Sequence, residues 1–197
     1  QVPIQLPSDR IQVRERFVDP MATLGAWGLS NDGERIVLET RGDLFVTRTK
    51  KKGLIRRITE SSLDRTKFPA LSPDGKLVAY VSNRAKDPDL DALRQDLFVI
   101  PTSGGKERRI PTPAGPIESP RFSPDSKLIA YIGHDNPDDA WGVTNAHVWL
   151  VGVNGALKAR DLMPRFDRMA YDQSIIDLAE GHGPSGLSWS ADGKRLF

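Results

Sequence analysis

The chain of 197 residues contains no cysteine and only three histidines, His134, His147 and His182. Without thiols there is no disulfide bond, no cysteine nucleophile and no zinc site with cysteine ligands. A conventional zinc site would need all three histidines or added carboxylates, and no His-Glu-x-x-His motif is present. The sequence therefore predicts no metal site. Absence of cysteine fits the cytoplasm and does not exclude an oxidising compartment such as the periplasm, so both localisations stay open.

Long apolar runs and a strong charge of one sign are missing too. Apolar stretches such as 77–81 and 148–151 are far shorter than the ~20 residues of a membrane helix, so we expect no membrane partner. Lys and Arg number 28 against 26 Asp and Glu, and 38% of the residues are apolar, as in a globular protein. The densest basic run, 48–52, is interpreted as a solvated turn, and no nucleic-acid partner is expected.

The motifs of common catalytic and cofactor sites are absent as well. Gly104 and Gly105 are interpreted as a hairpin turn, because no phosphate-binding glycine pattern surrounds them. No Gly-x-Ser-x-Gly sequence occurs, and the nearest approach, 183–186, lacks the required spacing. We therefore expect neither catalytic nor cofactor-binding residues. The chain starts with Gln1 and lacks a basic-then-apolar leader, so we expect a processed protein or a piece of a longer one.

One pattern recurs four times along the chain. Each copy reads apolar residue, Ser, any residue, Asp, then Gly or Ser, a charged residue and an apolar run. The Asp residues of successive copies are 42, 51 and 67 positions apart. Asp-Gly pairs favour tight turns, and the apolar runs that follow are typical of buried strands. The copies are 28–36, 70–78, 121–129 and 188–196.

Each copy opens a unit of four predicted strands. Second strands follow the turn at 76–81 and 127–132, and a further turn separates the third strand from a more polar fourth strand. Units of roughly 40 to 50 residues with four antiparallel strands are typical of β-propeller blades. A β-sandwich would lack the recurring corner, and helical repeats would show a 3.6-residue period. The predicted third strands are 43–47, 96–100 and 147–151, and the fourth strands are 55–59, 107–110 and 158–162.

The predicted fold class is therefore all-β, a β-propeller segment with three four-stranded antiparallel blades and the start of a fourth. We expect an N-terminal lead-in segment at 1–24 and a partial propeller at 25–197. Since propellers close with four to eight blades, the chain is expected to belong to a larger ring or to complete one by self-association. The expected blades are about 25–62, 68–112, 119–163 and, in part, 187–197.

Two insertions lengthen the loops between second and third strands, at 83–95 and 134–146. Such loops project from one rim of a propeller, where binding residues often lie. We single out Trp141, His134 and Asp135 as candidate peptide contacts. For Trp141 packing beneath its own loop remains the alternative. The acidic run from His134 to Asp139 departs from a calcium-loop spacing and favours a loop that caps its own backbone.

The remaining chemistry-bearing side chains receive packing roles. His147 alternates with apolar residues on a predicted strand and is expected to make a hydrogen bond there. Packing between blades is the interpretation of Trp27, Trp149 and Trp189. The segment 172–181 is expected to form a short helix or an irregular excursion.

The corner residues Ser72-Pro73-Asp74-Gly75-Lys76 resemble those of TolB-like propeller repeats, the WD-repeat-like blades of periplasmic and peptidase-associated propellers. Within residues 1–82, the segments 16–20 and 39–46 resemble tricorn-type proteases. Within residues 119–197, the segments 120–125 and 144–151 resemble the propeller of prolyl-oligopeptidase-type serine peptidases, especially acylaminoacyl peptidases. The resemblance implies a non-catalytic propeller that selects peptide substrates for a separate hydrolase domain. The alternative is a stand-alone TolB-like scaffold that binds proteins.

Overall fold

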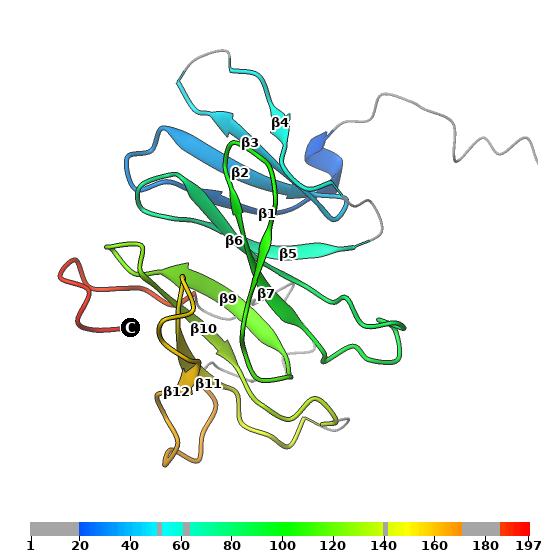
Figure 1. Cartoon of the computed structure of the whole chain (residues 1–197), viewed down its shortest axis with the longest axis vertical. Coiled ribbons are helices and arrows are strands. Elements are labelled where there is room, and N and C mark those ends of the chain that lie inside the picture. Colours follow the sequence, from blue (N-terminus) through cyan, green and yellow to red (C-terminus); the bar gives the residue numbers. More distant parts are fainter. Residues whose placement is uncertain (1–19, 51–52, 61–63, 140–141, 171–185) are drawn as a thin grey trace, which may run out of the picture.

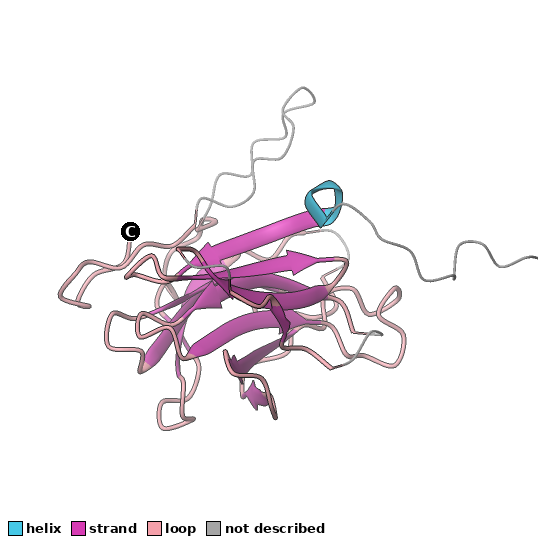
Figure 2. Ribbon diagram, turned by 90° about the horizontal axis from the view of Figure 1, so that it is seen from above, coloured by secondary structure: helices cyan, strands magenta, loops and turns pink. Residues whose placement is uncertain are grey.

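The computed structural model describes residues 20–50, 53–60, 64–139, 142–170 and 186–197. Its strands form three four-stranded sheets, each antiparallel and each in sequence order. In Figure 1 the sheets follow one another from the blue N-terminal blade to the third blade, which runs from green at β9 to orange at β12, and the red C-terminal segment lies beside the third. Seen from above, the described part is built of strands, with a single 3-10 helix at Pro20–Thr23 (Figure 2).

The strands have the following bounds. Blade 1 contains β1 (Leu24–Leu29), β2 (Arg35–Thr40), β3 (Asp43–Arg48) and β4 (Arg56–Arg57). Blade 2 contains β5 (Thr66–Leu71), β6 (Leu77–Ser82), β7 (Asp96–Pro101) and β8 (Arg108–Ile110). Blade 3 contains β9 (Ile117–Phe122), β10 (Leu128–Gly133), β11 (His147–Gly152) and β12 (Arg160–Asp161). The fourth unit begins with a bridge between Trp189 and Leu196.

The recurring corner has the same hydrogen bonds in all four units. In blade 2, the Ser72 hydroxyl donates to Asp74 Oδ1 at 2.6 Å and accepts the backbone N–H of Leu77 at 2.9 Å. Asp74 Oδ1 also accepts the N–H of Lys76. Gly75 has a φ of 66°, in the left-handed region that the reversal requires. Equivalent Ser–Asp hydrogen bonds, all 2.6 Å long, occur at Ser30, Ser123 and Ser190.

Apolar side chains from adjacent blades form the core. One cluster joins blades 1 and 2 through side chains such as Val37, Leu44 and Tyr80. A second joins blades 2 and 3, with Val99 and Tyr131 among its members. A third packs the far face of blade 3 against the fourth unit, including Leu187. Because blades 2 and 3 each bury apolar side chains on both faces, the stack holds together by burial of apolar surface.

Blade 1 has one face without a neighbour in the described part of the chain. The register pairs Trp27 with Leu38 and Leu38 with Phe45, which places these three side chains on the same face. Trp27 is 62% exposed, and Leu29, on the same face, is 49% exposed. Within the described part of the chain, Trp27 therefore does not have the packing between blades that the sequence predicts. Trp149 and Trp189 do pack in the cores of blade 3.

The predicted fold class is confirmed, and the third strands lie where the sequence placed them. The fourth strands are shorter than predicted, with β4 and β12 limited to two residues each. The division into a lead-in segment and a propeller stays a prediction. The predicted excursion 172–181 lies outside the described residues. Among the described residues, no helix has the length and apolarity needed to cross a membrane.

Candidate functional site

The first strands of the three blades lie side by side, with β1 against β5 and β5 against β9. They border a cavity of about 710 Å³, which we call the axial pocket. The volume falls within the range of small-ligand and peptide sites. Its walls combine apolar side chains with polar atoms. The lining residues are Trp27, Gly28, Leu29, Asn31, Pro69, Ala70, Leu71, Pro73, Arg121, Phe122, Pro124, Leu187, Ser188, Trp189, Ser190 and Ala191.

The two insertion loops lie on one rim and are connected. Arg94, in the loop between β6 and β7, forms an ion pair with Asp138 of the loop between β10 and β11, with 3.0 Å between Nη2 and Oδ1. Gln95 also accepts the backbone N–H of Ile117, at the start of β9, through its side-chain oxygen. The loops of neighbouring blades therefore form one continuous rim surface.

The loop after β10 caps its own backbone, as the sequence predicts. Asp139 Oδ2 accepts the N–H of Thr144 at 2.7 Å, and its Oδ1 accepts the N–H of Val143. His134 Nδ1 accepts the N–H of Asn136 at 3.3 Å. These acceptors are occupied by the loop itself. No group of three or more metal-ligating side chains occurs among the residues that the structure describes.

His134 and Asp135, two of the predicted peptide contacts, line a cleft of about 380 Å³ on this rim. Trp149, Asp161 and Phe166 line the same cleft. Burial lowers the pKa of His134, so the imidazole is neutral at pH 7. The third predicted contact, Trp141, lies outside the described residues. Peptide binding by these residues stays a prediction.

His147 makes the hydrogen bond that its place on a strand predicts. Its Nδ1 lies 2.7 Å from Asp161 Oδ2, across the pair formed by β11 and β12. The other ring nitrogen, Nε2, is buried and has no hydrogen-bond partner among the described residues. A hydrolytic triad needs a hydroxyl or thiol nucleophile at that nitrogen. The described arrangement is therefore a paired histidine and carboxylate without a nucleophile.

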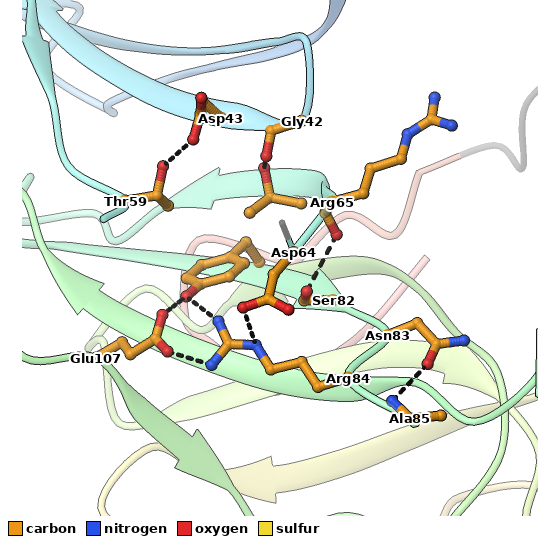
Figure 3. Close-up of polar contacts among 12 residues, drawn as sticks. Gly42, Asp43, Thr59, Asp64, Arg65, Ser82, Asn83, Arg84, Ala85 and Glu107 are labelled. Carbon is orange, nitrogen blue, oxygen red and sulfur yellow. Dashed lines mark hydrogen bonds and ion pairs between the residues drawn. The ribbon is translucent and has the colours of Figure 1, made fainter. Parts of the chain in front are cut away.

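A polar cluster joins blade 2 to the segment before β5 (Figure 3). The guanidinium of Arg84 lies between Glu107 and Asp64, and its carbon is 4.0 Å from the centre of the Phe98 ring. The buried hydroxyl of Tyr80 donates to Glu107. The hydrogen bond from Arg84 holds the pKa of Glu107 below its ordinary value, and burial raises the pKa of Tyr80. The cluster pins the segment between the blades and offers no reactive group.

Two charged residues of β9 were not singled out from the sequence. Glu118 and Arg121 lie on a first strand, where the repeat offers mainly small or apolar residues. Burial raises the pKa of Glu118, and burial lowers the pKa of Arg121. The signal was present in the sequence, because Arg121 occupies the position held by Gly28, Ala70 and Ser188 in the other units.

Comparison with known proteins finds relatives among dipeptidyl-peptidases. The chain is 31% identical over 137 residues to dipeptidyl-peptidase 5 of Arthroderma otae, which covers 64% of this chain and 17% of the relative. It is 27% identical over 176 residues to a probable dipeptidyl-peptidase 5 of Arthroderma benhamiae, covering 81% and 22%. The chain thus spans about a fifth of the length of these relatives. No model of a known protein family matches it.

Solved structures share the fold at low sequence identity. TolB from Acinetobacter baumannii superposes with a TM-score of 0.59 at 16% identity, over 88% of this chain and 37% of TolB. The tricorn protease superposes with a TM-score of 0.51 at 18% identity, over 66% of this chain and 13% of that protein. Together with the dipeptidyl-peptidase relatives, they confirm the resemblance to TolB-like propellers of peptidases that the corner motifs indicate.

Proposed function

We propose that the chain is a non-catalytic propeller region of a serine peptidase that admits short peptides to a separate hydrolase domain. The main support is that the stretch similar to dipeptidyl-peptidases folds as propeller blades that border the axial pocket. An extended peptide fits such a pocket, whereas a folded protein is too wide for it. The proposed partners are therefore peptides and a hydrolase domain.

The rim surface is the proposed entrance for the peptide. His134 and Asp135 line its cleft, and Trp141 belongs to the same insertion. The ion pair between Arg94 and Asp138 holds the two insertion loops together, so the entrance has a defined shape. Loops on a rigid scaffold are where binding residues concentrate.

Fluorescence anisotropy with two labelled probes tests this proposal. One probe is a fluorescein-labelled unstructured octapeptide, and the other is a small folded protein with the same label. We expect the octapeptide to bind the chain and the folded protein to remain free. Binding of the folded protein alone would favour the alternative of a protein-binding scaffold. Failure of both probes to bind would contradict both functions.

The rim contact is tested by H134A in the same assay. Removal of the half-buried imidazole is expected to weaken octapeptide binding about fivefold, which is the effect of losing one good interface contact. K158A is the control, because Lys158 is exposed in the turn at the opposite rim. Equal affinities of H134A and K158A would remove His134 from the proposed entrance.

A further inference from the structure

Arg121 is the one charged residue among those that line the axial pocket. It is half-buried on β9, and burial lowers the pKa of its guanidinium, since water is partly excluded there. No described carboxylate raises the pKa of Arg121. Arg84 differs, because its hydrogen bond to Glu107 raises its pKa. A cation that is kept partly dry without a partner is destabilised unless an anion arrives.

The blade architecture does not require an arginine at this position. The equivalent residues of the other three units are Gly28, Ala70 and Ser188, and all three line the same pocket. At Gly28 a Cβ would lie 3.1 Å from the backbone oxygen of Pro69, so the first strands approach closely there. The other three units therefore have a small residue at the position where blade 3 has an arginine.

The neighbouring unit leaves room for the guanidinium. A Cβ at Gly186 would lie 2.8 Å from Nη2 of Arg121, so a larger residue at 186 would displace the arginine head. The one hydrogen bond that the head makes to described residues runs from Nη1 to the oxygen of Pro120, at 3.1 Å. A guanidinium has five N–H donors, so most of them remain available to a ligand.

We infer that the axial pocket binds a peptide carboxylate on Arg121, with the adjacent apolar side chain against Trp27 and Trp189. A planar guanidinium matches a carboxylate with two parallel hydrogen bonds, and partial burial strengthens them. Two sources supply this group, the C-terminal carboxylate of a peptide and an Asp or Glu side chain. The inference rests on the proposed function, because it names the group by which the admitted peptide is held.

Three acetylated peptides separate the sources. The first is Ac-Ala-Ala-Leu with a free carboxylate, the second is its C-terminal amide, and the third is the amide with Glu in place of the central Ala. Binding to the full chain is followed by tryptophan fluorescence, because Trp27 and Trp189 line the pocket. We expect the free acid, the Glu-containing amide or both to bind about tenfold more tightly than the plain amide, which reflects one charge-assisted pair.

Variants assign the preference to Arg121. R121Q is expected to bind all three peptides with the affinity of the plain amide, and R121K to keep part of the preference. R108Q is the matched control, since Arg108 is exposed on β8 and the substitution removes the same charge as R121Q does. Should R121Q fail to fold, S188E places a carboxylate at the equivalent position of the next unit and is expected to abolish the preference.

The outcomes separate this inference from the proposed function. Binding of all three peptides with equal affinity, or an undiminished acid preference in R121Q, would overturn the carboxylate site and leave peptide admission standing. Absence of binding by any peptide would contradict both. Loss of the preference for acidic peptides in R121Q but not in R108Q would support the site. The acidic peptide whose affinity is higher for wild type than for R121Q then identifies the source of the carboxylate.

Discussion

The Ser and Asp residues of the four corners form the same hydrogen bonds in each unit. The Ser hydroxyl bridges the Asp carboxylate and the first residue of the next strand, as at Ser123, Asp125 and Leu128. The hydrogen bond from Ser holds the pKa of Asp125 below its ordinary value. The residue after Asp has a positive φ in every unit, 66° at Gly75 and 60° at Ser126. Left-handed backbone is strained for residues other than glycine.

Opposite stability changes are therefore expected at Gly75 and Ser126. G75V is expected to lower the free energy of unfolding by about 1–3 kcal/mol, because a β-branched residue is strained at this φ. S126G is expected to raise it by up to about 1 kcal/mol, since the strain is relieved and no described side-chain hydrogen bond is lost. Urea unfolding measures both. Equal stability of G75V and wild type would contradict the turn geometry.

Strands and the segments between them are joined by polar contacts as well as by apolar cores. Arg84 and Glu107 tie β6 and β8 to the segment before β5 through Asp64. Their side chains are 27% and 30% exposed, so water screens the pair only in part. Arg35 of β2 donates to the oxygen of Gly75 and to Thr102, which fixes blade 1 to the corner of blade 2. These hydrogen bonds therefore fix the position of blade 1 relative to blade 2.

E107Q tests the polar cluster that Arg84 forms with Glu107 and Asp64. The substitution is expected to lower the free energy of unfolding by about 1–2 kcal/mol at pH 7, because the charged partner of Arg84 is lost. The folded pKa of Glu107 lies below its ordinary value of 4.5, so its stabilisation is complete above that pH. The difference from wild type should persist from pH 7 to about 4.5 and shrink as the pH falls through the folded pKa.

D96N is the control for E107Q. Asp96 is 23% exposed but pairs with Arg109, which is 60% exposed, and a pair with one such solvated partner contributes about 0.5–1 kcal/mol. Urea unfolding across the acid range compares the two variants. An effect of E107Q no larger than that of D96N would show that the cluster stabilises the fold no more than an ordinary surface ion pair does.

The described blades form an arc, and within the described part of the chain one apolar face of blade 1 is uncovered. Trp27, Leu29, Leu38 and Phe45 share this face, and an exposed apolar patch of this kind is typical of a contact surface. A further blade or a second copy of the chain would bury it. Self-association through this face is therefore expected at high concentration.

L38R tests self-association. An arginine in the centre of this face opposes burial, so the variant is expected to remain monomeric at concentrations where wild type associates. L90R is the matched control, because Leu90 is 85% exposed in the loop between β6 and β7. Sedimentation velocity over a range of concentrations measures the difference. A wild-type chain that is monomeric throughout, or association undiminished in L38R, would argue against this face as the contact.

The amino-acid sequence alone determined the corner, the strand order and the blade count. Ser72, Asp74 and Gly75 interact within six residues of one another, so local chemistry specifies the reversal wherever the pattern recurs. Alternating apolar residues then specify the strands that flank each turn. Insertions interrupt the repeat, which also made the loops 83–95 and 134–146 visible.

Only the tertiary structure decided which distant residues meet. Arg94 and Asp138 are 44 positions apart, and no local pattern links them. The exposure of Trp27 and the approach of Arg121 to Gly186 depend on how neighbouring blades pack. Packing between blades comes from non-directional burial of apolar surface, whereas the corner comes from short-range hydrogen bonds. A sequence therefore specifies each blade directly, and the axial pocket exists only once the blades have docked.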